Sequence, residues 1–272
     1  MKSIPHKRYF VTYADEKFAC AGARIIKEAK SLGHFTECFL LTPNDVPDTI
    51  KNSCLWRFQR GGGYWVWKPW AISRILSQIE SGALLFYADA GCQLYKSREW
   101  MKFFTFTQRN TFMFFRIQGF TIRWVRRILR EAFPYGDKKT SMICAGTAMM
   151  MINTKRTREL ILLWLSTMLE HPEYVMDVPK QDRLKEDVSF IENRHDQAVL
   201  SGLLYKYKSE LGKCVRWEHF EQKAPDGWQA IWAARNCSGV RKVAKVSVVR
   251  YFFRRMFIYP ITFFRGVIGG SL

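Results

Sequence analysis

Short apolar runs alternate with longer amphipathic stretches along most of the chain. The short runs have the length of strands, whereas the long stretches repeat apolar residues at helical spacing and end near Gly or Pro. The pattern predicts strands at 9–13, 35–41, 83–88 and 143–153. It predicts helices at 18–32, 69–79, 121–133, 155–170 and 194–208. This alternation is typical of an α/β fold, in which the wholly apolar third strand is expected to be central and covered on both faces.

The end of the chain has a different composition. After Asp226 there is no acidic residue but there are eight basic ones, with many aromatic residues among them in the last 30 positions. Basic residues beside exposed aromatic residues are typical of an interfacial membrane anchor. We therefore expect a catalytic domain over residues 1–225 and a basic, aromatic, membrane-associating tail over residues 226–272. The alternative is that the aromatic residues pack on the domain and the arginines are solvated.

The predicted helix 121–133 is expected to add to this basic surface. Its arginines fall at helical spacing and are expected to share one face: Arg123, Arg126, Arg127 and Arg130. The whole chain of 272 residues has a formal charge of +19, yet 48% of it is hydrophobic. This composition excludes a disordered polycation, because the apolar residues are numerous enough to form a core.

The distribution of cysteines and apolar runs indicates the compartment. Seven cysteines are scattered along the chain without a CxxC pair, which indicates neither a disulfide framework nor a structural zinc site. The first residues lack the apolar core of a secretory signal, and there is no run of about 18 apolar residues. We expect a cytoplasmic protein that does not span a membrane. High positive charge with abundant aromatic residues also fits a nucleic-acid-binding protein, which is the alternative class.

A carboxylate follows the third predicted strand. Asp89 lies in the sequence YADAG at the carboxyl end of this strand, where open α/β sheets bind ligands, and is expected to hold a divalent metal or a ribose. Asp15, just after the first strand, is its natural companion. Thr12 and Tyr13 beside it could hydrogen-bond to a base and stack on it. The alternative interpretation is a turn Asp, because Asp-x-Gly turns are common.

Residues 60–70 have the sequence RGGGYWVWKPW. Three glycines allow the backbone to approach a ligand closely, the aromatic residues supply stacking faces, and Arg60 and Lys68 supply cations. This combination suits a sugar together with a phosphate. The spacing matches neither a Walker A loop nor a GxGxxG dinucleotide motif. The alternative is a Gly-rich hairpin beside an aromatic core.

A further polar group opens the predicted helix 194–208. His195, Asp196 and Gln197 offer a base, a carboxylate and an amide within one turn, at a helix N-terminus that attracts anionic and hydroxylated ligands. The alternative is a capping Asp beside a surface His.

Together these blocks resemble a known pattern. The strand end TYAD, the RGGGYWVWKPW block, YADAG, the strand CAGTAMMMIN and the helix start RHDQAVLSGLL look like those of a bacterial glycosyltransferase of GT-A type, similar to enzymes of capsular polysaccharide and lipopolysaccharide O-antigen biosynthesis. The resemblance covers residues 8–220. It implies a single domain with a Rossmann-like mixed sheet flanked by helices. It also implies transfer of a hexose from a nucleotide sugar, usually a UDP-sugar, to a lipid-linked or lipopolysaccharide saccharide.

The resemblance implies a metal site, but one of its expected ligands is absent from this sequence. Asp89 matches the first Asp of a DxD motif, which binds the donor diphosphate through Mn²⁺ or Mg²⁺, but Gly91 replaces the second Asp. Metal affinity is therefore expected to be lower, and His219 is the residue expected to add a ligand. Alternatively, part of the charge that the metal would supply comes from lysines, of which Lys68, Lys138 and Lys139 are the candidates.

The resemblance also assigns catalytic residues. Asp196 and Gln197 are similar to the pair in retaining members, where the Asp grips the donor sugar hydroxyls and its neighbour lies beneath the anomeric carbon. An inverting enzyme would instead use Asp196 or His195 as a base, and retention is favoured. Gly146 is implied to lie where the donor or acceptor sugar packs. A lipid-linked acceptor would place the enzyme peripherally at the inner face of the cell membrane; a noncatalytic scaffold is the remaining alternative.

Overall fold

The computed structural model describes residues 7–137, 141–217, 220–225 and 227–244 and positions 246 and 249. Within them, a seven-stranded mixed sheet has the order β2-β1-β3-β7-β5-β6, and β8 also pairs with β5. The strands are β1 (Arg8–Tyr13), β2 (Glu37–Leu41), β3 (Leu84–Ala88), β5 (Phe112–Phe120), β6 (Met142–Cys144), β7 (Ala148–Ile152) and β8 (Val215–Trp217). β1 is parallel to β2 and β3, whereas β7 is antiparallel to both of its neighbours. A small second sheet pairs β4 (Gln93–Leu94) with β9 (Ile231–Trp232).

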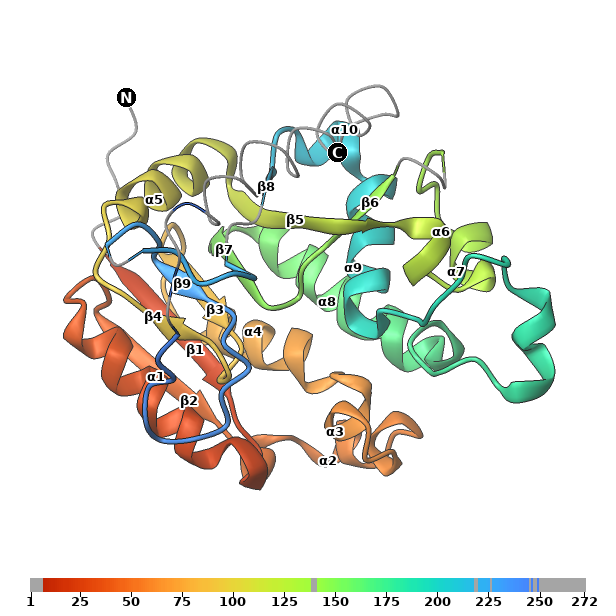
Figure 1. Ribbon diagram of the computed structural model, residues 1–272, viewed down its shortest axis with the longest axis horizontal. Coiled ribbons are helices and arrows are strands. Elements are labelled where there is room, and N and C mark those ends of the chain that lie inside the picture. Colours follow the sequence, from red (N-terminus) through yellow and green to blue (C-terminus); the bar gives the residue numbers. More distant parts are fainter. Residues whose placement is uncertain are drawn as a thin grey trace.

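Helices cover both faces of the main sheet (Figure 1). One face packs against α4 (Trp67–Gln78), α8 (Lys155–Glu170) and α9 (His195–Lys206). The other packs against α1 (Ala19–Ser31), α5 (Glu99–Asn110) and the small sheet. Side chains of a strand point alternately to its two faces, so Val11 of β1 joins the first core and Phe10 the second. Every residue of β3 is buried, as expected for a strand covered on both faces.

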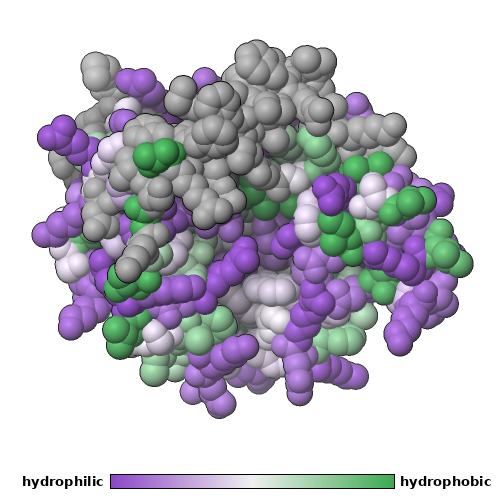
Figure 2. Space-filling view, in the orientation of Figure 1, coloured by the Kyte–Doolittle hydropathy of each residue, from purple (hydrophilic) through white to green (hydrophobic). Residues whose placement is uncertain are grey.

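Short elements connect these layers. They are η1 (Glu16–Phe18), η2 (Pro43–Asp45), α2 (Asp48–Lys51), η3 (Leu55–Arg57), α3 (Gly61–Tyr64), α6 (Thr121–Trp124), α7 (Arg127–Ala132), η4 (Pro172–Tyr174), η5 (Lys180–Lys185) and α10 (Lys208–Leu211). The described surface in the view of Figure 2 is mainly hydrophilic, with apolar residues scattered over it. In the described ranges, none of the helices combines the length and apolarity needed to cross a bilayer.

The α/β alternation predicted from the sequence is confirmed, with two differences in strands. The single strand predicted at 143–153 is split into β6 and β7, because the chain bends at residues 146–147 between them. The aromatic and basic segment at 99–120, for which the apolar pattern predicts no element, forms α5 and the long strand β5.

The predicted helix 121–133, with its basic face, is wrong. The backbone is extended at Val125, which separates α6 from α7. Arg126 and Arg130 turn inward, and each lies 3.8 Å from a carboxylate oxygen of Glu186. The Arg126 guanidinium also donates to the Glu173 carbonyl at 2.6 Å. Arg123 and Arg127 remain exposed, so the four arginines do not share the single solvent-facing row that regular helical spacing predicts.

The sequence after position 225 is predicted to form a separate tail, but its first part packs on the domain. β9 pairs with β4, and the Gln93 side-chain amide donates to the Lys242 carbonyl at 3.2 Å. Arg241 donates to Glu28 of α1 at 3.0 Å. The domain therefore extends at least to Lys242, and most of the aromatic part of the predicted tail lies outside the described residues.

Candidate functional site

A cavity of about 430 Å³ opens where β1 and β3 end side by side. Parallel strands direct their carboxyl ends to the same edge of the sheet, where α/β proteins bind ligands. Its walls come from the ends of both strands, the Gly-rich block and the segment after β9: Tyr13, Asp15, Lys17, Phe18, Gln59, Gly61, Gly62, Trp65, Trp67, Asp89, Ala90, Gly91, Cys92, Thr147, Ala233 and Arg235. Of the predicted donor-binding residues, Tyr13, Asp15, Asp89 and Gly91 contribute to these walls.

A buried lysine connects two of the predicted carboxylates. The Lys68 ammonium lies 2.9 Å from Asp196 Oδ2 and 3.3 Å from Asp89 Oδ1. The side chains of Lys68 and Asp196 are only 2% and 3% exposed, whereas that of Asp89 is 33% exposed and reaches the cavity. Lys68 comes from the first turn of α4, Asp89 follows β3, and Asp196 lies in the first turn of α9. Three separate blocks of the sequence therefore meet at one ammonium group.

The environment of this lysine favours its charged form. Burial alone would lower the pKa of Lys68, but the carboxylates of Asp196 and Asp89 outweigh it and raise the pKa above its ordinary value. Burial raises the pKa of Asp89, although Lys68 and Tyr87 oppose this effect. The Tyr87 hydroxyl donates to Asp89 Oδ1 at 2.5 Å. One oxygen of Asp89 is thus engaged by two donors, which fixes the orientation of the carboxylate.

Gly146 lies against this charged group. A Cβ atom at position 146 would be 2.7 Å from Asp196 Oδ2, 2.9 Å from Gln197 Cγ and 3.1 Å from Lys68 Nζ. Such distances are too short for a side chain, so glycine is needed where the chain turns between β6 and β7. The interruption of the predicted strand therefore makes room for the Lys68 and Asp196 pair. Gly146 and Gln197 are absent from the cavity walls of the described chain, although Thr147 belongs to them.

The Gly-rich block forms a left-handed turn. Five consecutive residues, from Gly61 to Trp65, have φ between 51° and 89°. This conformation costs roughly 1–2 kcal/mol for each residue that has a side chain, which explains the three glycines. Backbone hydrogen bonds from Tyr64 to Arg60 and from Trp65 to Gly61 close the turn. The Trp67 indole donates to the Gly61 carbonyl at 2.9 Å and holds the turn against α4.

Aromatic rings form one side of the cavity. Tyr13 and Trp67 are stacked, with ring centroids 4.1 Å apart and an angle of 15° between their planes. Both side chains are largely buried, at 5% and 8% exposed, and both reach the cavity. Trp65 also reaches it and stacks on the His195 ring with centroids 5.1 Å apart. The cavity thus has flat apolar faces that are held in place by packing.

His195 lies behind Trp65 and outside the cavity walls in the described part of the chain. Its backbone φ is +49°, and its Nδ1 donates to the Val175 carbonyl at 2.6 Å. Its Nε2 is buried without a hydrogen-bond partner among the described residues. Burial lowers the pKa of His195 below its ordinary value, so the ring is neutral at neutral pH.

Three other residues that are predicted to bind the donor make local contacts within the protein. Asp15 caps η1 by accepting from the Phe18 amide at 3.0 Å, while it also borders the cavity. Thr12 is fully buried, and among the described residues its hydroxyl oxygen has no hydrogen-bond partner. Arg60 points to the carboxylates of Asp177 and Glu192, at 3.3 and 3.4 Å, rather than into the cavity.

No sequence motif predicts two of the cations that line the cavity. Lys17 follows Asp15 closely, whereas Arg235 comes from the segment after β9 and has a left-handed backbone. The Arg235 side chain is 80% exposed and lies 3.1 Å from Glu221 Oε2. Burial raises the pKa of Glu221. Lys17 is adjacent to a predicted ligand, but no motif marks Arg235, which reaches the site only through the pairing of β9 with β4.

The described residues do not form a metal site by themselves. Asp89 is the predicted metal ligand within these ranges, and no group of three or more His, Cys, Asp or Glu side chains is suitably placed among them. An ammonium group, that of Lys68, lies beside the Asp89 carboxylate instead. His219, the second predicted ligand, and the lysines Lys138 and Lys139 lie outside the described residues.

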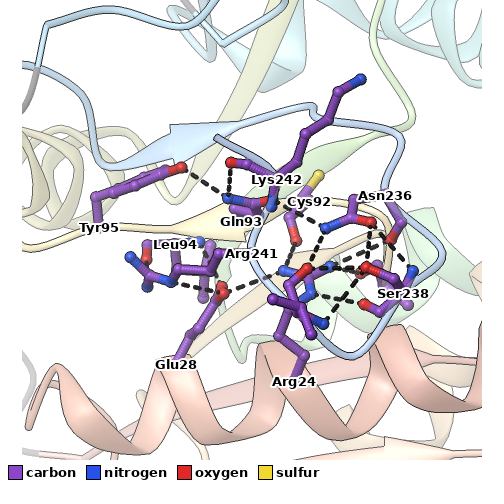
Figure 3. A network of polar contacts seen from close by, with 12 residues as sticks. Arg24, Glu28, Cys92, Gln93, Leu94, Tyr95, Asn236, Ser238, Arg241 and Lys242 are labelled. Carbon is purple, nitrogen blue, oxygen red and sulfur yellow. Dashed lines mark hydrogen bonds and ion pairs between the residues drawn. The ribbon is translucent and has the colours of Figure 1, made fainter. Parts of the chain in front are cut away.

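The loop that carries Asp89 is fixed by a network of polar contacts (Figure 3). The buried Arg24 guanidinium donates to the carbonyls of Ala90 and Cys92 on one side. It donates to the carbonyls of Asn236 and Ser238 on the other. Its charge is balanced by Glu28, 3.1 Å away on α1. Arg24 therefore joins the loop after β3 to the segment that carries Arg235.

This chain has low similarity to known proteins in sequence and in structure. No protein-family model matches the sequence, and no curated protein matches it. Similar solved structures include a glycosyltransferase involved in the glycosylation of the major capsid of PBCV-1, with 9% identity, a TM-score of 0.44 and coverage of 78% of this chain and 81% of that one. The galactosyltransferase LgtC, in complex with donor and acceptor sugar analogues, has 15% identity and a TM-score of 0.44 over 76% and 72% of the two chains. A 4-diphosphocytidyl-2C-methyl-D-erythritol synthase from Anaerococcus prevotii has 10% identity and a TM-score of 0.37 over 73% and 97%.

Proposed function

We propose that this chain is a glycosyltransferase that moves a hexose from a nucleotide sugar, a UDP-sugar in the first instance, to a saccharide acceptor. The acceptor is lipid-linked or part of a lipopolysaccharide, and the enzyme meets it at the inner membrane surface. The observation that carries the proposal is the cavity at the ends of β1 and β3, which joins flat aromatic faces to cations and carboxylates. A nucleotide sugar needs these three kinds of contact: stacking for its base, cations for its diphosphate and hydrogen-bond acceptors for its sugar.

Each contact has candidates in the cavity. The stacked rings of Tyr13 and Trp67 offer a rigid face for the base. Lys17 and Arg235 offer two positive charges for the diphosphate. Asp89, held by Lys68 and Tyr87, offers its exposed oxygen to a hydroxyl group of the donor.

In the proposed reaction the bond between the anomeric carbon and the diphosphate oxygen breaks, and a bond to the acceptor hydroxyl oxygen forms. The acceptor proton passes to the departing diphosphate, whose negative charge Lys17 and Arg235 stabilise. Asp196, which pairs with Lys68, and its neighbour Gln197 are proposed to orient the donor sugar for retention. His195 is proposed to position the Trp65 ring, on which it stacks. Binding of Mn²⁺ or Mg²⁺ by Asp89 and His219 stays a prediction.

Thermal unfolding in the presence of UDP, UDP-sugars and other nucleotides, with and without Mn²⁺, tests the proposal. A ligand that binds only the native state at about 100 times its Kd adds about 2.7 kcal/mol, which is a Tm increase of about 5–8 °C for a chain of this size. The variant Lys17→Ala/Arg235→Ala is expected to lose most of this increase. Its control, Lys27→Ala/Arg74→Ala, removes two cations that are absent from the cavity walls and is expected to keep it.

A wild-type protein whose Tm no nucleotide or nucleotide sugar changes would contradict the proposed donor class. An equal Tm increase in wild type and in the cavity variant would show that the ligand binds elsewhere. Release of UDP from a UDP-sugar, followed with a coupled assay, distinguishes an active enzyme from a noncatalytic scaffold that only binds the nucleotide.

A further inference from the structure

A second, open groove lies away from the donor cavity, between α5 and the start of β8. It has a volume of about 540 Å³ and shares no lining residue with the donor cavity. Its walls are Met101, Lys102, Thr105, Phe106, Arg109, Asn110, Lys213 and Arg216. Figure 1 shows α5 and β8 near each other along one border of the molecule.

The groove is strongly basic. Four of its eight lining residues are Lys or Arg and none is acidic. Lys102, Arg109 and Lys213 are exposed. Among the described residues, these four cations form no ion pair with a carboxylate, in contrast to Arg126 and Arg130 of the predicted basic face. The carboxylates of the described ranges therefore do not neutralise these four charges.

The cations surround an apolar centre. Lys102, Phe106 and Arg109 lie about one turn apart on α5 and therefore share a face of this helix. Met101 beside them is 48% exposed, and Phe106 is half-buried, so apolar atoms lie among the cations. Cations around exposed apolar atoms are typical of surfaces that contact the headgroup region of a bilayer.

We propose that this groove binds the phosphate groups of anionic lipids and holds the protein on a membrane surface. Lys102, Arg109 and Lys213 contact the phosphates, while Met101 enters the boundary between headgroups and acyl chains. The site is separate from the donor cavity and does not depend on the proposed transferase activity. It also differs from the arginine row that the sequence predicted, because the carboxylates of the described chain leave these cations unpaired.

A single-stranded nucleic acid is the other polyanion that such a charge could attract. Proteins that bind single strands offer open aromatic faces on which bases stack. The one aromatic residue among the groove walls of the described chain is Phe106, and the Arg216 guanidinium lies over its ring, 5.1 Å from the centroid. The groove walls within the described ranges therefore lack an open stacking face, and their chemistry favours lipid phosphate over bases.

Vesicle flotation of the full chain tests the proposal. The probe is a set of vesicles of phosphatidylcholine alone or with one third phosphatidylglycerol, in about 0.1 M salt. A Lys or Arg near an anionic surface increases binding about fivefold, so the variant Lys102→Glu/Arg109→Glu is expected to bind the anionic vesicles at least about 25-fold more weakly. The control variant Arg74→Glu/Lys180→Glu makes the same change in net charge at exposed positions of α4 and η5. It is expected to bind within about threefold of wild type.

Three results would overturn the proposal. The first is unchanged flotation of the groove variant, which would assign membrane binding to another part of the chain. The second is an equal loss in both variants, which would show an effect of bulk charge alone. The third is a groove variant that floats like wild type but, unlike the control variant, no longer binds a single-stranded RNA. This result would assign the groove to nucleic acid. Circular dichroism shows whether each variant is folded. The variant Met101→Ser leaves the net charge unchanged and provides a second test, in which binding to the anionic vesicles is expected to fall several-fold.

Discussion

Replacement of Lys68 by Met removes the ammonium that joins Asp89 to Asp196. Methionine has a similar length and fits a buried position, so the change in packing is small. The change in electrostatics is large, because the Asp196 side chain is only 3% exposed and loses the cation at 2.9 Å. Removal of one partner from a buried ion pair typically costs about 3–5 kcal/mol. This is a large part of the total stability of about 5–15 kcal/mol that folded domains have.

The expected loss is measurable by heat or denaturant. For a chain of 272 residues, about 3–5 kcal/mol lowers Tm by about 6–15 °C, which calorimetry or circular dichroism detects. The matched control is Lys155→Met, which breaks the ion pair with Glu159 at 3.7 Å. The Lys155 side chain is 86% exposed, and solvent screens such a pair, so its loss is expected to cost less than about 0.5 kcal/mol.

A double variant separates charge from packing. In Lys68→Met/Asp196→Asn the buried carboxylate is replaced by a neutral amide, so at least about half of the stability lost in Lys68→Met is expected to return. The double variant also decides the outcome if the single one does not fold. A Lys68→Met variant within about 1 kcal/mol of wild type, or a double variant no more stable than the single one, would contradict a strong buried pair between Lys68 and Asp196.

Two further variants test the backbone and the titration of the site. Gly61→Ala is expected to lower Tm more than Gly33→Ala. Both glycines have positive φ, but only at position 61 would the new Cβ lie 2.5 Å from the Trp65 ring. Equal losses of Tm in the two variants would contradict this close contact. Burial lowers the pKa of His195, so its contribution to stability is complete above its ordinary pKa of about 6.5 and is lost as the pH falls through the lower folded value. In the variant His195→Asn, the asparagine tolerates the left-handed backbone and can still donate to the Val175 carbonyl. Between about pH 7 and pH 5, urea unfolding should show a smaller loss of stability in this variant than in wild type.

The apolar pattern was sufficient for the elements whose burial is regular. The helix predicted at 155–170 agrees with α8, and the run 83–88 agrees with β3. The pattern does not predict β5, because a buried charge interrupts the apolar residues of this strand. Arg116 is only 8% exposed, and its guanidinium lies 5.5 Å from the centroid of the Trp217 ring on β8. A partner 101 positions away along the printed sequence makes this Arg tolerable in a strand, and local patterns cannot show such a partner.

The motifs located the blocks of the site but not their contacts. Lys68, Asp89 and Asp196 each lie in a block that the sequence marks, yet their ion pairs depend on how α4, β3 and α9 meet around the sheet. His195 and Asp196 are neighbours in sequence, but the positive φ at His195 turns its ring toward Trp65 while Asp196 faces Lys68. The direction of each side chain follows from the tertiary fold, and residue type alone does not determine it.

Gly91, which stands where the resemblance implies a second Asp, contacts the C-terminal segment. The Gly91 carbonyl accepts from the Asn236 amide at 3.0 Å, and a Cβ at position 91 would contact Arg235 Cα at 3.4 Å. Position 91 therefore provides a close backbone contact that Arg24 reinforces by binding the carbonyls on both sides of it. The same contact brings the Arg235 cation to the wall of the cavity. If the proposed function holds, the Arg235 guanidinium, which lies 3.1 Å from Glu221, supplies positive charge near position 91 where the resemblance implies an acidic metal ligand.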